Sequence, residues 1–150
     1  MQYSVLKTTI KNAVATFIGE LTFGIGTSEQ MNADDNIDYP LCWMLPPTVQ
    51  NNIAPNGSQL QGWNFTLRIV QSSSLEATRD EDDELFNETF NIAQGLIRKL
   101  YNDFQDNTTE TIQVGQLSQL FRTQDSVHVG WNVPITINSV TDNNCCELFV

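Results

Sequence analysis

Residues 126–140 read SVHVGWNVPITINSV, and this stretch decides the fold that the sequence predicts. Every second residue is apolar, and the apolar set is Val127, Val129, Trp131, Val133, Ile135 and Ile137. Strict alternation is typical of a β-strand with one buried face and one face toward water. Pro134 falls on the second face and has no N–H to donate, so we expect it at a sheet edge or a bulge.

Other stretches predict further strands. Residues 62–71, GWNFTLRIVQ, alternate in the same way, with Trp63, Phe65, Leu67 and Ile69 on one face. We expect a short strand at residues 39–47, YPLCWMLPP, where the prolines end it or confine it to an edge. A fourth strand is expected at residues 111–122, with a bulge near Gly115, followed by a hairpin turn at RTQDS.

Helical spacing of apolar residues indicates two helices. The first covers residues 4–19, with Ser4 as a possible cap and an apolar face that starts at Val5. The second and stronger one covers residues 79–105. Its first turn holds Asp80–Glu84, where the helix dipole favours negative charge. Its apolar stripe is Phe86, Phe90, Ala93, Leu96, Ile97, Leu100, Tyr101 and Phe104.

The order helix, strand, strand, helix, strand, strand predicts an α+β fold. We expect an antiparallel sheet of about four strands, two helices packed on one face, and long inter-strand loops or arms. The length of 150 residues predicts one domain, residues 1–150. If the two apolar faces are buried, Trp131→Ala or Phe90→Ala should lower the free energy of unfolding by roughly 3–5 kcal/mol.

Charge and cysteine content exclude several classes of protein. The chain has 18 acidic and 7 basic residues, a formal net charge of −11. Such a chain repels a phosphate backbone and an anionic membrane surface. No stretch reaches the apolar length of a membrane span, and the start of the chain lacks the order of parts of a signal peptide. Cys42, Cys145 and Cys146 are a poor disulfide framework, which predicts reduced thiols in a cytosolic compartment.

Candidate chemical sites fail on spacing. His128 is the sole histidine, and alternation places it on the solvated face, where it cannot form a triad with Asp125 and Ser126. Cys42, Cys145, Cys146 and His128 could supply four zinc ligands, but adjacent cysteines point apart. We therefore expect no metal, no cofactor and no catalytic residues.

The acidic clusters, the glycines and the tryptophans have structural interpretations. Asp80–Glu84 lack the spacing and central glycine of a calcium loop, and so do Asp34, Asp35 and Asp38. Gly24-Ile25-Gly26 is too short for a phosphate loop and no Lys-Ser/Thr follows it. Core packing is the first interpretation of three residues that fall on strand faces, Trp43, Trp63 and Trp131.

Taken together, YPLCWMLPP, GWNFTLRIV, the helix with the acidic start and VHVGWNVPITI followed by a cysteine-bearing end resemble a known group of virion proteins. These are the head–tail joining and tail-terminator proteins of tailed bacteriophages, in particular phages of Bacteroidetes, including crAss-like ones. The resemblance covers most of residues 1–145 as a pattern of elements. It implies a structural virion protein without enzymatic activity, assembled in the host cytoplasm into a ring of six or twelve copies at the phage neck or tail end.

The resemblance also implies the partners. The ring would contact portal, neck and tail proteins, and genome DNA would pass its acidic lumen without specific binding. Residues 22–38 and 46–61 are the expected arms toward a neighbouring copy. Two alternatives stay open from the residues alone. One is an acidic monomeric inhibitor or DNA mimic that binds a basic partner, and the other is a small enzyme with an unrecognised carboxylate site.

Overall fold

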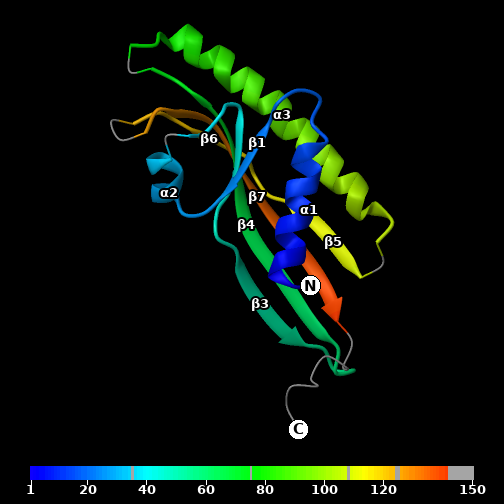
Figure 1. Ribbon diagram of the computed structural model, residues 1–150. Helices are drawn as coiled ribbons and strands as arrows, with labels where there is room; N and C mark the ends of the chain where they lie inside the picture. Colours follow the sequence, from blue (N-terminus) through cyan, green and yellow to red (C-terminus); the bar gives the residue numbers. More distant parts are fainter. Residues whose placement is uncertain (35, 75, 108, 124–125, 142–150) are drawn as a thin grey trace.

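The computed structural model describes residues 1–34, 36–74, 76–107, 109–123 and 126–141 (Figure 1). These residues form three helices and seven strands, and all seven strands belong to one mixed sheet. The α+β class is compatible with this arrangement. The expected count of about four strands and two helices is wrong, because short elements lie in stretches that we expected to be loops.

The centre of the sheet is one long antiparallel pair. β4 (Gln59–Ser72) runs beside β7 (His128–Thr141) over 14 residues of each strand, from Gln59 opposite Thr141 to Ser72 opposite His128. The alternation predicted for both strands is confirmed, since Trp63, Phe65, Leu67 and Ile69 are all buried. In β7 the corresponding buried set is Val129, Val133, Ile135 and Ile137. Two predicted members of this set differ: Trp131 is half-buried, and Val127, which precedes the strand, is 41% exposed.

The shorter strands extend this pair on both sides. β2 (Leu41–Met44) and β3 (Thr48–Ile53) pair with successive parts of β4, and β1 (Thr22–Ile25) lies parallel to β2. On the far side, β5 (Glu110–Val114) and β6 (Ser118–Leu120) pair with successive parts of β7. Pro46 and Pro47 end β2 as expected, but β2 is not an edge strand, because β1 and β4 flank it and all four of its residues are buried.

Pro134 explains why the strand expected at residues 111–122 is two strands. The Gly115 N–H donates to the Pro134 carbonyl at 2.8 Å, so Pro134 faces the interruption between β5 and β6. In an antiparallel strand the N and O of one residue point the same way, so the missing proline N–H would also face this interruption. The expected bulge near Gly115 is thus confirmed, and β7 can lie inside the sheet despite its proline.

Two helices cover one face of the sheet, as expected. α1 (Tyr3–Ala15) and α3 (Arg79–Gln105) bury apolar residues against β2, β4 and β7. The bounds of α3 agree with the sequence prediction. A capping box fixes its start: Thr78 Oγ1 accepts from the Glu81 N–H at 3.3 Å, and Glu81 Oε2 accepts from the Thr78 N–H at 3.2 Å.

The predicted apolar faces of the helices need correction. α1 buries Leu6, Ile10, Ala13 and Val14. Val5 is 47% exposed, and the N-cap is Gln2, without a side-chain bond, rather than Ser4. In α3, Phe90 is 38% exposed, because Thr89 and Ile92 occupy the centre of the buried stripe. A full core penalty for Phe90→Ala was therefore the wrong expectation.

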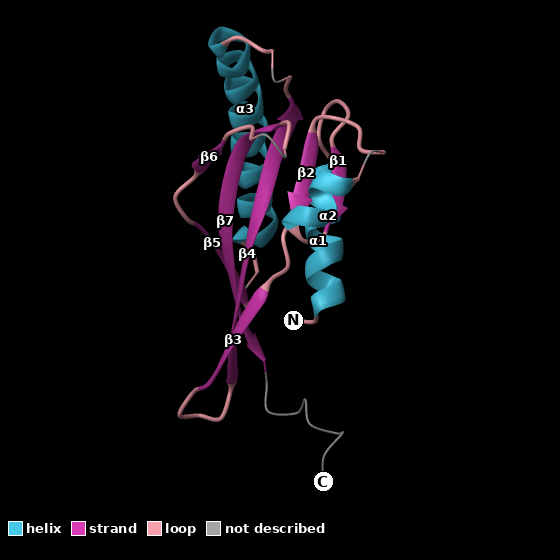
Figure 2. Ribbon diagram, turned by 90° about the vertical axis from the view of Figure 1, so that its left-hand side faces the viewer, coloured by secondary structure: helices cyan, strands magenta, loops and turns pink. Residues whose placement is uncertain are grey.

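The opposite face is covered at one end only. α2 (Ser28–Ala33) packs there, and Met31, Leu41, Trp43 and Val70 form a second, small core. Residues 22–38 are therefore not an arm, since they supply β1 and α2 to the packed body. Figure 2 shows the β3–β4 hairpin extending beyond the helices at the other end. No helix among the described residues is long and apolar enough to cross a membrane.

Two glycines yield opposite predictions for the same substitution. A Cβ on Gly130 would lie 1.9 Å from the Ile69 carbonyl oxygen, where backbone cannot yield. Gly130→Ala should therefore lower the free energy of unfolding by about 3 kcal/mol or more, as overpacking does. Gly95, inside α3, has no atom within 4 Å of such a Cβ, so Gly95→Ala should raise this free energy by about 0.5–1 kcal/mol.

Urea unfolding of the two variants against the parent chain measures both changes. Equal midpoints for Gly130→Ala and the parent would contradict the close approach of β4 and β7.

Candidate assembly interface

His128 is buried, which contradicts its expected place on a solvated face. Its side chain is 3% exposed at the end of the sheet that α2 covers. Nε2 lies 2.8 Å from the Tyr39 hydroxyl, and Nδ1 lies 2.9 Å from Ser126 Oγ and 3.1 Å from Asn32 Oδ1. Because Asn32 Oδ1 can only accept, we assign the proton to Nδ1, with the Tyr39 hydroxyl donating to Nε2.

This cluster links residues that are distant in the sequence, and it is not arranged as a serine nucleophile with a histidine base. Ser126 and His128 are two residues apart and their side chains are in contact, so the expected separation by alternation is wrong for this pair. However, Nδ1 carries its proton toward Asn32 Oδ1 and cannot accept one from Ser126, and the far nitrogen meets Tyr39 rather than a carboxylate. A serine nucleophile needs the opposite arrangement. Asp125 lies outside the described residues.

The proposed zinc ligands are not brought together by the described residues. Cys42 is fully buried in the main core, and burial raises the pKa of its thiol to about 12, so it stays protonated. Cys145 and Cys146 lie outside the described residues. Within the described ranges, no group of three or more His, Cys, Asp or Glu side chains is placed to hold a metal ion.

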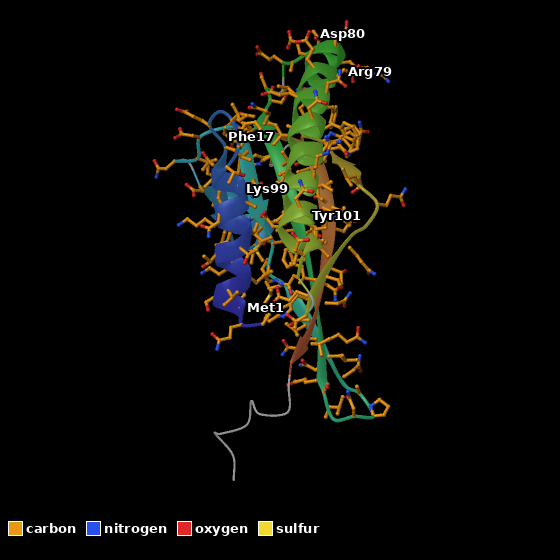
Figure 3. The ribbon with its side chains drawn as sticks, turned by 90° about the vertical axis from the view of Figure 1, so that its right-hand side faces the viewer. Met1, Phe17, Arg79, Asp80, Lys99 and Tyr101 are labelled. Atoms are coloured by element: carbon orange, nitrogen blue, oxygen red, sulfur yellow. The ribbon has the colours of Figure 1, made fainter. Side chains whose placement is uncertain are left out.

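The acidic clusters have local partners. Glu81 completes the cap of α3, and Asp82 accepts from the Ser73 hydroxyl at 2.7 Å and pairs with Arg122 at 3.2 Å. Asp34 accepts from the Asn36 N–H at 3.0 Å, which closes a turn, while Asp35 lies outside the described residues. Asp80 marks the extreme end of the molecule in Figure 3.

The glycines at 24 and 26 serve the packing of Trp43. A Cβ on Gly24 would lie 2.4 Å from the Trp43 ring, and the Trp43 indole N–H donates to the Gly26 carbonyl at 2.9 Å. Trp43 and Trp63 are buried, as core packing predicted. Trp131 is only half-buried, and its indole N–H donates to the Phe86 carbonyl at 2.9 Å.

The most exposed strand among the described residues is β3, which forms a hairpin with β4. All six residues of β3 are exposed, and among the described residues β3 pairs with β4 alone. The tip is a tight turn in which the Ala54 N–H donates to the Ser58 carbonyl at 2.8 Å and Gly57 has φ +86°. Ile53, at the end of β3, is 78% exposed. Residues 46–61, expected as an arm toward a neighbouring copy, thus include a hairpin that projects from the body.

The hairpin and the sheet face opposite α1 and α3, which we call the open sheet face, carry almost no charge. No charged residue occurs between Asp38 and Arg68 or between Glu110 and Arg122, in a chain of which 17% of residues are charged. Among the described residues, the charged residues of the strands are Arg68 and Glu110, apart from His128. Elsewhere on this face amides and hydroxyls are exposed, including Thr48, Gln50, Asn64, Thr111 and Asn138. The described carboxylates other than Glu110 lie on helices and connections.

Arg68 is the one cation on this face of the described sheet. It is half-buried, its Nε donates to Asn132 Oδ1 at 3.1 Å, and a terminal nitrogen donates to Ser28 Oγ at 2.9 Å. Both acceptors are neutral, and burial lowers the pKa of Arg68. Arg68 therefore ties α2 to the sheet.

Comparison of the chain with protein-family models gave no match, and comparison with curated proteins gave none either. The site must therefore be interpreted from its own geometry.

The His128 cluster predicts how stability depends on pH. Burial, and secondarily the charge of Arg68, lowers the pKa of His128 below its usual 6.5. The unfolded chain therefore takes up a proton at a higher pH than the folded chain does. The contribution of His128 to stability should be complete above about pH 6.5 and decline as the pH falls through that value toward the lower pKa of the folded chain.

Urea unfolding between pH 7.5 and 5 checks this, with His128→Gln as the control that removes the titrating group. The difference in free energy of unfolding between the parent chain and the variant should shrink toward low pH. A constant difference would contradict the depressed pKa.

Proposed function

We propose that the chain is a structural subunit that assembles with its own copies into a ring at the neck or tail end of a tailed bacteriophage. The observation that carries the proposal is the uncharged, projecting β3–β4 hairpin with its fully exposed strand β3. An edge strand with free backbone groups and exposed apolar side chains is a template for pairing with another chain. A monomeric protein usually protects such an edge with charge, and β3 has none.

The charge distribution favours a second copy as the partner. Two chains of net charge −11 repel each other wherever carboxylates meet. Contact through a surface without carboxylates avoids this cost, and the hairpin and the open sheet face provide such a surface. A partner with a basic surface would instead favour acidic residues at the contact.

The remaining acidic surface suits passage of DNA. In a ring joined through its neutral surfaces, the carboxylates of α3 and the connections stay in solvent, and those that face the lumen repel phosphates. Genome DNA then slides through without specific binding. Portal, neck and tail proteins would meet the two flat sides of the ring.

One observation favours the alternative, an acidic monomeric inhibitor or DNA mimic. Glu76, Asp80, Glu81, Asp83, Glu84 and Glu88 are exposed around the start of α3, at one end of the molecule. Such a cluster could bind a basic partner. The two functions differ in oligomeric state, since a mimic acts as a monomer.

Native mass spectrometry and negative-stain electron microscopy test the proposal. We expect closed rings of six or twelve copies, alone or on co-purified tail tubes. A chain that stays monomeric at all accessible concentrations and on tail tubes would overturn it. Portal, tail-tube or tape-measure reading frames beside the gene would support the phage assignment.

Added charge on the hairpin should weaken assembly without changing the fold. Gln50→Glu with Asn52→Asp places two carboxylates on exposed β3 at nearly constant shape. At about 0.5–1 kcal/mol for each unfavourable charge, the association constant of each contact should fall roughly five- to thirtyfold, and added salt should restore part of it.

The matched control is Asn87→Asp with Gln94→Glu, which adds the same charge at exposed positions of α3. Equal weakening of assembly by the two double substitutions would indicate a general effect of added charge and would count against the hairpin as the contact.

A further inference from the structure

An apolar groove separates the C-terminal end of α1 from the middle of α3. It has a volume of about 340 Å³, and its walls include Ala13, Val14, Phe17, Leu21 and Leu96. Figure 3 labels Phe17 and Lys99, which both line this groove. Lys99 is the only charged residue in its lining, and it is already paired with Asp103 at 2.7 Å.

Gly95 forms part of the groove wall, and the isolated chain gives no reason for a glycine there. The residue lies inside a 27-residue helix, where glycine is less favourable than alanine. Outside the adjacent backbone of the helix, a Cβ would meet no atom of the described residues within 4 Å, so none of these neighbours requires its absence. What the missing side chain provides is room for something that approaches from outside.

Ile18 is the second unexplained residue of the groove. It follows Phe17 at the rim, and its side chain is 98% exposed, the highest value among the exposed large hydrophobic side chains of the described residues. Ile53 at the hairpin tip, 78% exposed, comes next. Burial of either side chain would be favourable, and neither is buried within its own chain.

We propose that the groove binds the β3–β4 hairpin tip of a second copy, with Ile53 packed against Phe17 and Ile18 and over Gly95. This inference rests on the proposed ring. The tip has no charged residue and exposes Ile53 and Pro55. The described groove lining has no unpaired charge, so the contact brings no like charges together. In Figure 3 the hairpin is at one end of the molecule and Phe17 lies toward the other. The hairpin therefore cannot reach the groove of its own chain. A contact with a second copy joins two different surfaces head to tail, which is the kind of contact that closes into rings.

Site-specific photo-crosslinking identifies the occupant. A benzophenone amino acid replaces Ile18, and equal amounts of ¹⁵N-labelled and unlabelled full-length chain are assembled and irradiated. We expect mixed-isotope crosslinks from position 18 to residues 52–58. Crosslinks that map to another part of the second copy, or rings that form without any such crosslink, would overturn the inference.

A substitution that fills the groove distinguishes an effect on assembly from an effect on folding. Gly95→Gln places a long side chain in open space and improves helix propensity, so the melting temperature should stay equal or rise. The association constant should fall at least about tenfold, which corresponds to about 1.4 kcal/mol. Asn87→Gln, an exposed change on the same helix, should leave assembly unchanged.

The outcomes distinguish the inference from the proposed function. Rings that persist in Gly95→Gln, or an equal loss in Asn87→Gln, would overturn the groove as the acceptor and leave the ring intact. Failure of the parent chain to form rings would overturn both.

Discussion

The antiparallel pairing of β4 with β7 is the interaction on which the rest of the structure depends. These two strands supply both buried apolar rows under α1 and α3, and every other strand except β1 pairs directly with one of them. Each strand of this pair is long enough to pair with two short strands on its outer side. The break between β5 and β6, opposite Pro134, therefore lowers the stability of the sheet only slightly. Its tightest point is Gly130, where the backbones leave no room for a side chain.

Charge in this protein is segregated by element type. Strands contain hydroxyl and amide side chains on their open face, while helices and connections contain nearly all the described carboxylates. Repulsion among the carboxylates therefore acts around the sheet rather than between its paired strands. For the same reason, the surfaces that are least costly to bring against another copy are the sheet with its hairpin and the groove between α1 and α3, where Lys99 is paired with Asp103.

The sequence predicted the long elements well because their patterns are long. The bounds of α3 were predicted correctly, because an acidic first turn is followed by a long apolar stripe. Alternation identified β4 and β7. β3 could not be found this way. All six of its residues are exposed, so it has no buried face to leave a pattern, and it is a strand only because β4 continues beyond the body beside it. β1 and α2 are too short for periodicity to show.

His128 shows what alternation cannot tell. The rule assigned it correctly to the face opposite Trp131, but it gave no information on what covers that face. Asn32 and Tyr39, almost 100 residues earlier in the chain, cover it and fix its hydrogen bonds. Face assignment is a local property, whereas burial depends on tertiary contacts.

The same distinction explains why the groove escaped sequence reasoning. Helical spacing does not single out Gly95 or Ile18, since a glycine is tolerated within a helix and an isoleucine near its end fits an apolar stripe. Only packing reveals that neither is accounted for within the chain: the glycine leaves space that nothing fills, and the isoleucine stays in water. Each disfavours the isolated subunit slightly, and the two stand at one groove. A single contact with an uncharged segment that exposes an apolar side chain would account for both, and the hairpin tip with Ile53 is such a segment.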